Sequence, residues 1–116
     1  MAANLLGNAD LVTAATAGTT AGEVTFNKQV NQVSCTNQHA TAKMWVRVFT
    51  GSTAAAANTA AVATVAVASA DENFYIPPAN GRTVVFKSAR KTFVALSIIA
   101  DGATTLGTFT GTNWLD

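Results

Sequence analysis

Hydrophobic and polar residues alternate with a period of two along much of this chain, which is the period of a β-strand. Segment 41–50 shows the alternation most clearly. Strict alternation places one face of a strand in a core and the other face elsewhere. One face carries Ala42, Met44, Val46 and Val48, and the other carries Lys43, Trp45, Arg47 and Phe49.

Segment 92–100 differs because it is nearly apolar on both faces (TFVALSIIA). This favours a central strand covered on each side, or a strand whose outer face meets a partner. The Asn-Gly at 80–81 and the Asp-Gly at 101–102 predict type I′ hairpin turns, which need positive φ at both central residues. The Pro-Pro at 77–78 cannot donate ladder hydrogen bonds, so it ends a strand or lies on an edge.

Turn residues divide the chain into short segments at roughly ten-residue spacing, which is typical of a sandwich or jelly roll. We therefore predict an all-β fold: an antiparallel β-sandwich, jelly-roll-like, in one domain over residues 21–116. Residues 1–20 hold few large apolar residues. We predict that they form an extended, flexible N-terminal arm whose order depends on a partner. The predicted strands are 11–15 (weak), 23–26, 29–36, 41–50, 62–69, 72–76, 82–87, 92–100 and 104–109, with a short last segment at 112–115.

The alanine-rich segment 52–70 has two interpretations. Alanine is the best helix former, so one interpretation is a helix over 53–61. Three later valines favour a strand in the second half, because branched side chains suit strands. We predict a loop over 51–60 and a strand over 62–69.

The composition is poor in charge. Charged residues make up 11% of the 116 residues, against roughly 25% in an ordinary soluble domain. Alanine occurs 24 times and threonine 18 times. Seven basic and six acidic residues nearly cancel, which leaves no broad electrostatic grip on nucleic acid or an anionic membrane. So little charge gives weak protection against association, and a protein that lives in an assembly does not need that protection.

Residues that carry enzyme chemistry are sparse. Cys35, the single cysteine, has no partner for an internal disulfide. It shares a face with His39 if the strand continues, but the surrounding QVSCTNQHA has no nucleophile elbow and no second pair of metal ligands. Asp71-Glu72 is the only adjacent carboxylate pair and lacks the further oxygen ligands that calcium needs. We predict no catalytic, cofactor or metal site, and a protein that is not an enzyme.

Two groups of residues are candidates for a partner interface. The first is Trp45 and Phe49 with Arg47, opposite the Met44 face of segment 41–50. Tryptophan and arginine are typical interface anchors. If the Met44 face is the core, this outer face is exposed or covered by a partner. The alternative is that both faces of the strand are covered inside one domain.

The second group is basic: Arg82, Lys87, Arg90 and Lys91 lie in a stretch, 73–100, that contains no acidic residue. One interpretation is a patch that docks on an acidic protein surface. The alternative is a solvated edge strand and turn, because lysine and arginine often guard sheet edges. Nucleic acid fits less well because the charges are too few.

The order of features from Phe74 to Trp114 carries a resemblance. In FYIPPANGRTVVFKSARKTFVALSIIADGATTLGTFTGTNW an edge strand ends in proline, then come a hairpin, a long apolar strand and a Gly/Thr tail that ends in tryptophan. The low-charge composition and the Ala/Thr/Gly-rich N-terminus accompany it. Together these features resemble the small structural proteins of tailed-bacteriophage virions, in particular β-sandwich proteins that decorate or cement capsids.

The resemblance implies a virion protein, assembled in the host cytoplasm, that bridges neighbouring major capsid proteins. Its expected partners are the major capsid protein and copies of itself in a symmetric homo-oligomer such as a trimer, with no nucleic acid, membrane or small-molecule substrate. Two alternatives stay open. One is a tail, connector or fibre-base component. The other is a carbohydrate-binding β-sandwich module, which usually places several aromatics on one flat face; nine aromatics occur here.

Overall fold

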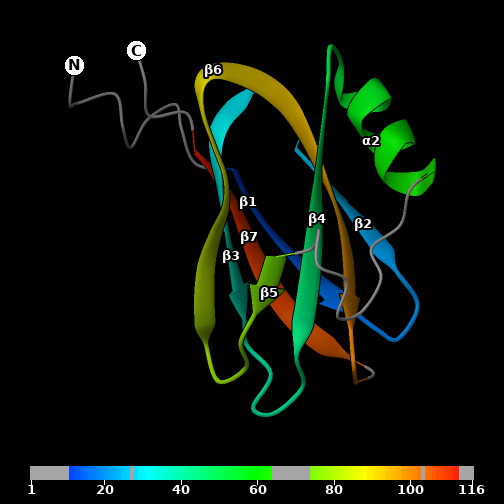
Figure 1. The fold of residues 1–116 in the computed structure, drawn as a ribbon, viewed down its shortest axis with the longest axis vertical. Coiled ribbons are helices and arrows are strands. Elements are labelled where there is room, and N and C mark those ends of the chain that lie inside the picture. Colours follow the sequence, from blue (N-terminus) through cyan, green and yellow to red (C-terminus); the bar gives the residue numbers. More distant parts are fainter. Residues whose placement is uncertain (1–10, 27, 64–73, 103, 113–116) are drawn as a thin grey trace.

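The computed structural model describes residues 11–26, 28–63, 74–102 and 104–112 (Figure 1). Seven strands and one helix follow one another along this part of the chain. They are β1 (Leu11–Ala17), β2 (Gly22–Thr25), β3 (Val30–Asn37), β4 (Met44–Gly51), α2 (Ala54–Ala63), β5 (Phe74–Ile76), β6 (Gly81–Ala100) and β7 (Thr105–Thr112).

The strands form two antiparallel sheets that share β6. Sheet 1 has the order β1-β7-β3-β6. Sheet 2 has β6 between β2 and β4, and β5 on the far side of β4. The first half of β6, residues 81–92, pairs with β3, and the second half, 93–100, pairs with β4 and in part with β2. The predicted all-β, antiparallel fold is confirmed, whereas the jelly-roll arrangement stays a prediction.

A bend within β6 lets one strand serve both sheets. Residues 88–91 of β6 lie opposite a single residue of β3, Asn31. Extra residues on one strand of a pair bend that strand and increase its twist. The two separate strands predicted over 82–87 and 92–100 are therefore two halves of one element (Figure 1).

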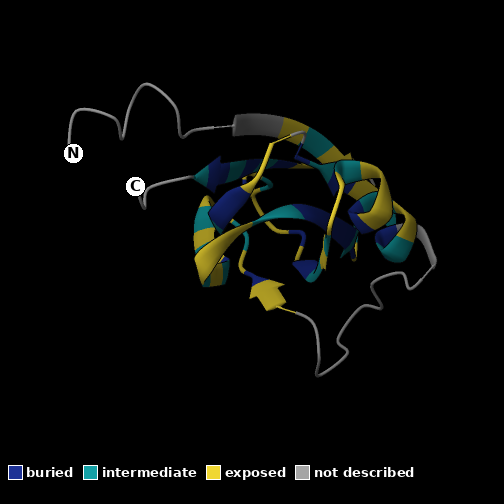
Figure 2. Ribbon diagram, turned by 90° about the horizontal axis from the view of Figure 1, so that it is seen from above, coloured by how far each residue is buried: buried dark blue, intermediate teal, exposed yellow. Residues whose placement is uncertain are grey.

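One hydrophobic core fills the space between the two sheets. Val33 and Phe109 reach it from sheet 1, and Met44 and Val46 reach it from sheet 2. The sequence left open which face of segment 41–50 is buried, and the structure places the Met44 and Val46 face in this core. Figure 2 shows buried and exposed residues alternating along the strands. The buried cluster comprises Ala17, Val24, Phe26, Val30, Val33, Cys35, Met44, Val46, Ile76, Val85, Val94, Leu96, Ile98, Ala100 and Phe109.

Two glycines of β7 make room for large core side chains. A Cβ added to Gly107 would lie 2.9 Å from Met44 Cε, and one added to Gly111 would lie 2.9 Å from Phe26 Cδ1. A close-packed core has no room for contacts this short. Each glycine therefore leaves the space that a methionine or phenylalanine from another strand fills.

Helix α2 packs on the outer face of sheet 2 through alanines. The Thr53 Oγ1 accepts a hydrogen bond from the Ala56 N–H at 3.0 Å, which caps the helix N-terminus. Ala57 and Ala61 are buried against Ala95 of β6. Small side chains on both surfaces allow the helix to approach the sheet closely.

The predicted loop over 51–60 is therefore wrong, and the helical interpretation of 53–61 holds. The cap at Thr53 and the buried alanine face supply a start signal and a tertiary contact, which together outweigh the pull of the valines toward a strand. Residues 62–63 of the predicted strand belong to α2. Residues 64–69 lie outside the described residues.

Strand β1 lies within the segment predicted as an arm. It pairs with β7 along its whole length, Leu11 to Ala17. The weak strand predicted at 11–15 is thus confirmed, and residues 11–17 form a sheet strand where a flexible arm was expected. Residues 1–10 lie outside the described part, and the dependence of the arm on a partner stays a prediction.

Turn geometry differs from both predicted type I′ turns. Before β6, φ is positive at Ala79 (61°) and Asn80 (64°), so the left-handed pair lies one residue earlier than predicted. Gly81 instead begins β6, where a Cβ would clash with the backbone of the preceding proline turn. After β6, φ is positive at Thr104 (58°), and no glycine among the described residues has positive φ, so the Asp-Gly at 101–102 does not form the predicted turn.

Buried Asn37 ties three segments together at the end of β3. Its Nδ2 donates to the Ala42 carbonyl at 2.7 Å and to the Ile76 carbonyl at 3.2 Å. Its Oδ1 accepts from the His39 N–H at 3.0 Å. The His39 Nδ1 in turn accepts from the N–H groups of Thr41 and Ala42 at 3.0 and 2.9 Å. These bonds fix the connection from β3 to β4 without any helix or strand.

The contact between α2 and the sheet predicts a sharp size limit at Ala57. Replacing Ala57, whose exposed fraction is 0%, by leucine forces extra atoms between helix and sheet. We expect Ala57→Leu to lower the free energy of unfolding by about 1–3 kcal/mol, as overpacked cores do. Ala55→Leu, on the exposed side of the same helix, is the matched control and should change it by less than about 0.5 kcal/mol. Urea unfolding followed by circular dichroism measures both, and equal effects would contradict the packing.

Candidate partner-binding surface

Trp45 and Phe49 do not form an exposed anchor. Trp45 keeps only 8% of its surface exposed, and its ring lies 5.8 Å from the ring of Tyr75 on β5. Phe49 is half-buried against the alanines of α2. For these two residues the alternative holds, in which both faces of the strand are covered inside one domain. For Phe49 the sequence missed this cover because it assigned a loop to the residues that form the helix.

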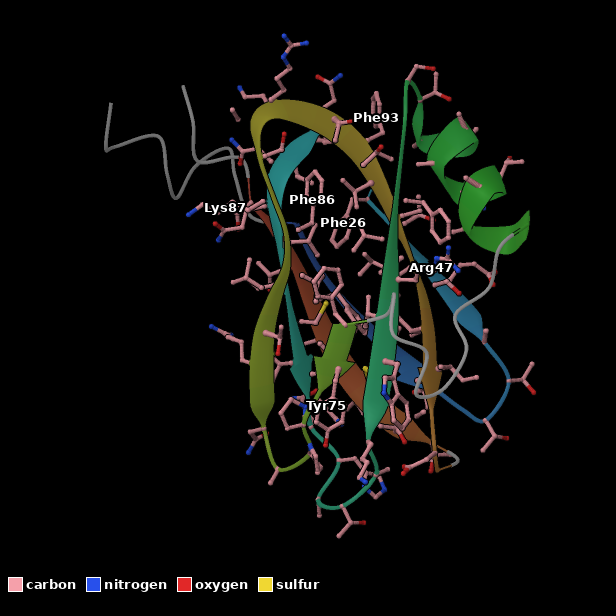
Figure 3. All side chains as sticks on the ribbon, viewed as in Figure 1. Phe26, Arg47, Tyr75, Phe86, Lys87 and Phe93 are labelled. Carbon is pink, nitrogen blue, oxygen red and sulfur yellow. The ribbon has the colours of Figure 1, made fainter. Side chains whose placement is uncertain are left out.

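Arg47 lies between these two aromatics on the outer face of β4. Its Cζ lies 5.6 Å from the centre of the Phe49 ring, within the range of a cation–π interaction. Figure 3 shows its side chain on the side of the sheet where α2 lies. Arg47 is half-buried, so most of its contact surface is used within the domain.

The four predicted basic residues are all exposed but do not form a single patch. The Arg82 Nε donates to Thr36 Oγ1 at 3.2 Å near the start of β6. Lys87, Arg90 and Lys91 lie at the other end of the domain, at and beside the bend (Figure 3).

The pairing of β3 with β6 brings a further lysine to that end. Lys28 lies in the connection from β2 to β3, which pairs with β6 just beyond the bend through Phe26 and Val30. Lys28 is exposed. We call Lys28, Lys87, Arg90 and Lys91 the basic end. The sequence could not add Lys28, because nearly sixty residues separate it from the others.

The outer surface of sheet 1 is open, in contrast to that of sheet 2. Among the described residues, α2 packs on β2, β4 and β6 of sheet 2, and no helix covers sheet 1 (Figure 2). Two large apolar residues are prominent on sheet 1: Val84 is 49% exposed and Leu106 is 43% exposed. The register of the strands places the members of this surface in rows. We call it the open face; it comprises Ala14, Thr16, Gln32, Ser34, Thr36, Arg82, Val84, Lys87, Leu106, Thr108, Thr110 and Thr112.

The open face combines hydroxyl groups with apolar area. Threonine supplies a methyl and a hydroxyl, so a row of threonines can hydrogen-bond a partner and also lose water from apolar surface. Its two charges, Arg82 and Lys87, lie on β6 at one margin of the sheet. A partner can therefore cover the centre of the face without desolvating a charge, which would cost free energy.

Sequence alone did not identify the open face. The alternation T-x-T-x-T from Thr108 to Thr112 predicts that these threonines share a side of the strand. It does not tell which side is outward. The pairing Thr36–Thr108 and Ser34–Thr110 shows that strands far apart in sequence present the same residue types side by side.

Cys35 and His39 serve the fold. Cys35 is buried in the core, and burial raises the pKa of its thiol from the ordinary value of 9.0 to about 12. His39 holds the connection from β3 to β4 through the two hydrogen bonds to its Nδ1. In the part of the chain that the structure describes, no group of three or more His, Cys, Asp or Glu residues could hold a metal ion. The pair Asp71-Glu72 lies outside the described residues.

The chain has no match among known proteins in three comparisons: no family model, no curated protein and no solved structure matches it. The helix in the described residues is also too short to cross a membrane.

The buried thiol predicts slow modification. The thiolate is the reactive form, and burial disfavours it, so a maleimide or disulfide reagent at about pH 8 should label folded Cys35 at least about 100-fold more slowly than the unfolded chain. The same shift makes the thiol a destabilising group at high pH. The unfolded thiol ionises above pH 9.0 while the folded thiol stays protonated up to about pH 12, so stability falls across that interval.

Cys35→Ala separates this effect from other titrations. The difference in free energy of unfolding between wild type and Cys35→Ala should shrink as pH rises from 9.0 toward 12. Rapid labelling of the folded chain, at the rate of a free thiol, would contradict the burial.

Proposed function

We propose that this chain is a structural protein of a tailed-phage virion that decorates the capsid and bridges neighbouring major capsid proteins. The observation that carries the proposal is the open face: a weakly charged sheet surface, rich in threonine, with Leu106 exposed on the inner strand β7 and Val84 exposed on the marginal strand β6. A solvated sheet face ordinarily carries charged side chains. A face like this one suits burial under another protein.

The chemistry of the open face favours a protein partner with a flat, polar surface. Interface cores are depleted in charge, and their rims are polar and solvent-accessible. Val84 and Leu106 supply apolar area, the threonines supply hydrogen bonds, and Arg82 and Lys87 occupy the margin where water can still reach them. The contact requires no moving part and no cofactor, and it acts by joining subunits that the shell alone leaves unjoined.

The basic end steers the association of the protein with the shell through its positive charge. Three of its four residues, Lys87, Arg90 and Lys91, fall within five positions of one another. Charges at the rim of an interface mainly change the association rate and its salt dependence. The basic end therefore draws the protein toward an acidic region of the shell, and the open face supplies the lasting contact.

Two alternatives are tested by location and ligand. A tail, connector or fibre-base component would use the same surface, and a map of the virion with the protein labelled separates it from a head protein. A carbohydrate-binding module is favoured by one observation, the exposure of Phe74 (43%) and Tyr75 (44%) on β5. Binding on a glycan array that is lost in Tyr75→Ala would support it against the capsid proposal.

The open face predicts which substitutions release the protein from the shell. Undecorated shells of the major capsid protein from the same genome are mixed with purified protein, and bound copies are counted after sedimentation. The double variant Val84→Glu with Leu106→Glu should lower binding at least about tenfold, because it replaces the two large apolar residues of the contact with charged ones. Ala55→Glu, on the exposed side of α2, is the matched control and should bind like wild type.

The same binding experiment tests both the decoration proposal and the open face as the contact. Wild type should also raise the temperature at which the shells rupture. If wild type neither binds nor raises that temperature, the decoration proposal is wrong. If the double variant binds as well as wild type does, the open face is not the contact.

The basic end predicts a salt-dependent rate. Arg90→Ala with Lys91→Ala should slow association with the shell at about 20 mM salt and have little effect at about 500 mM. At the higher concentration salt screens the attraction between the basic end and the shell before they touch. The dissociation rate should stay within about twofold of wild type. Stopped-flow light scattering or surface plasmon resonance measures both rates, and an effect on dissociation alone would place the basic end inside the contact.

A further inference from the structure

Four sheet edges have no second neighbour strand among the described residues: β1 and the first half of β6 in sheet 1, and β2 and β5 in sheet 2. The first half of β6 carries the charges of Arg82 and Lys87. Free edges attract further strands, and proteins usually protect them with short strands, proline, charge or a covering element. β5 has three residues and is followed by two prolines. β2 has four residues, carries Glu23, and contacts α2 through the hydrogen bond from Thr25 Oγ1 to Asn58 Oδ1 at 2.9 Å.

Strand β1 lacks the short length, the proline and the charge that protect the other edges. It has seven residues, LVTAATA, with no charge and no proline. Its register with β7 runs without a bulge from Leu11 opposite Gly111 to Ala17 opposite Thr105. A long, regular, uncharged edge is the kind that accepts another strand.

The direction of the backbone groups on β1 follows from its register with β7 and from one hydrogen bond between β7 and the residue after β3. The Gln38 N–H donates to the Leu106 carbonyl at 2.9 Å, so Leu106 turns its backbone groups toward the β3 side. Successive residues of an antiparallel strand point these groups to opposite sides. Odd-numbered residues of β7 therefore face β1, and their partners in register, Ala15 among them, face β7.

The even-numbered residues of β1, which are Val12, Ala14 and Thr16, consequently turn their N–H and C=O groups away from β7. The next even residue bears this out, because the Gly18 carbonyl accepts a hydrogen bond from the Ala100 N–H of sheet 2 at 2.8 Å. Among the described residues no strand pairs with the backbone groups of Val12, Ala14 and Thr16, which form the free edge.

We propose that a second copy of this chain pairs antiparallel with β1, about a two-fold axis that passes between the two Ala14 residues. In this register Val12 of each copy lies opposite Thr16 of the other, and Ala14 lies opposite Ala14. Only outward-facing residues then meet one another, so every free backbone group from Val12 to Thr16 gains a partner. No two like charges come together, because β1 carries none.

A second copy fits better than an unrelated strand because a two-fold contact between identical edges leaves neither edge unpaired. An antiparallel contact between identical edges uses the same surface on both subunits, and both edges disappear when it forms. The two four-stranded sheets become one sheet of eight strands, and the two open faces become continuous. The inference does not depend on capsid binding, and its test uses the purified chain alone.

Hydrogen exchange along β1 gives the sharpest test. In the dimer the amides of Val12, Ala14 and Thr16 should exchange slowly, like those of Thr13 and Ala15, which face β7. On dilution below the dissociation constant, the even-numbered amides alone should become fast. Sedimentation velocity over the same concentrations should show the shift from dimer to monomer. A monomer at all concentrations up to about 1 mM, or fast even-numbered amides in a dimer, would overturn the proposal.

Ala14→Pro removes one outward N–H at the centre of the contact. Proline is tolerated on an edge strand where the N–H faces solvent, so the monomer should keep its fold, as circular dichroism can check. We expect this variant to be monomeric at concentrations at which wild type is dimeric. A folded Ala14→Pro variant that still dimerises would show that β1 is not the contact.

A second pair of variants keeps the test valid if proline disturbs the fold. Ala14→Lys places two like charges opposite each other and should weaken the dimer about fivefold. Mixing it with Ala14→Glu should restore dimers, now of mixed composition. Thr110→Lys lies on the same face one strand further in, opposite Val12, and is the matched control that should leave the dimer intact. Equal weakening by Thr110→Lys, or no recovery on mixing, would overturn the proposal.

Discussion

The bend in β6 joins the two sheets and sets how they lie against each other. A single strand of 20 residues supplies an edge to sheet 1 and a centre to sheet 2, so the two sheets are joined by backbone as well as by packing. Residues 88–91 of β6 lie opposite one residue of β3, Asn31. These extra residues bend β6 and turn it from one sheet to the other. This fixes the spacing of the sheets, and that spacing decides which side chains fit between them. The glycines of β7 and the buried phenylalanines are matched to it.

The outer surfaces of sheet 1 and sheet 2 follow from the same arrangement, but only that of sheet 2 is covered by a helix of the described residues. Beyond the bend, Ala95 of β6 points outward, and Ala57 and Ala61 of α2, which are four residues apart, pack against it. Before the bend, β6 carries Arg82, Val84 and Lys87 outward, where no helix of the described residues packs. One sheet therefore completes its packing within the chain. No helix of the described residues packs on the threonines and apolar residues of the other sheet.

The sequence predicted the features that depend on local pattern. The period of two predicted antiparallel strands and which residues of segment 41–50 share a face, because alternation and burial are directly linked. It did not tell which of the two faces is buried. It failed where a distant contact decides the outcome. The alanines of 54–63 form a helix because Thr53 caps it and Ala95 receives it, and Trp45 is covered by neighbours that its own strand does not contain. Identifying the open face requires the register of the four strands of sheet 1. Placing Lys28 beside the bend likewise requires knowing how the connection from β2 to β3 pairs with β6.

The pairing of β1 with β7 has a consequence for how the chain folds during synthesis. The two strands lie almost at opposite ends of the described chain, so sheet 1 cannot close until residues 105–112 have been made. Contacts of such long range make folding slow, on a scale of roughly milliseconds to seconds. Until then β1 has no sheet to join and presents no ordered edge. If a second copy pairs with β1 as proposed, a ribosome-bound or truncated chain cannot yet recruit it, and pairing must wait until synthesis has reached the last described strand.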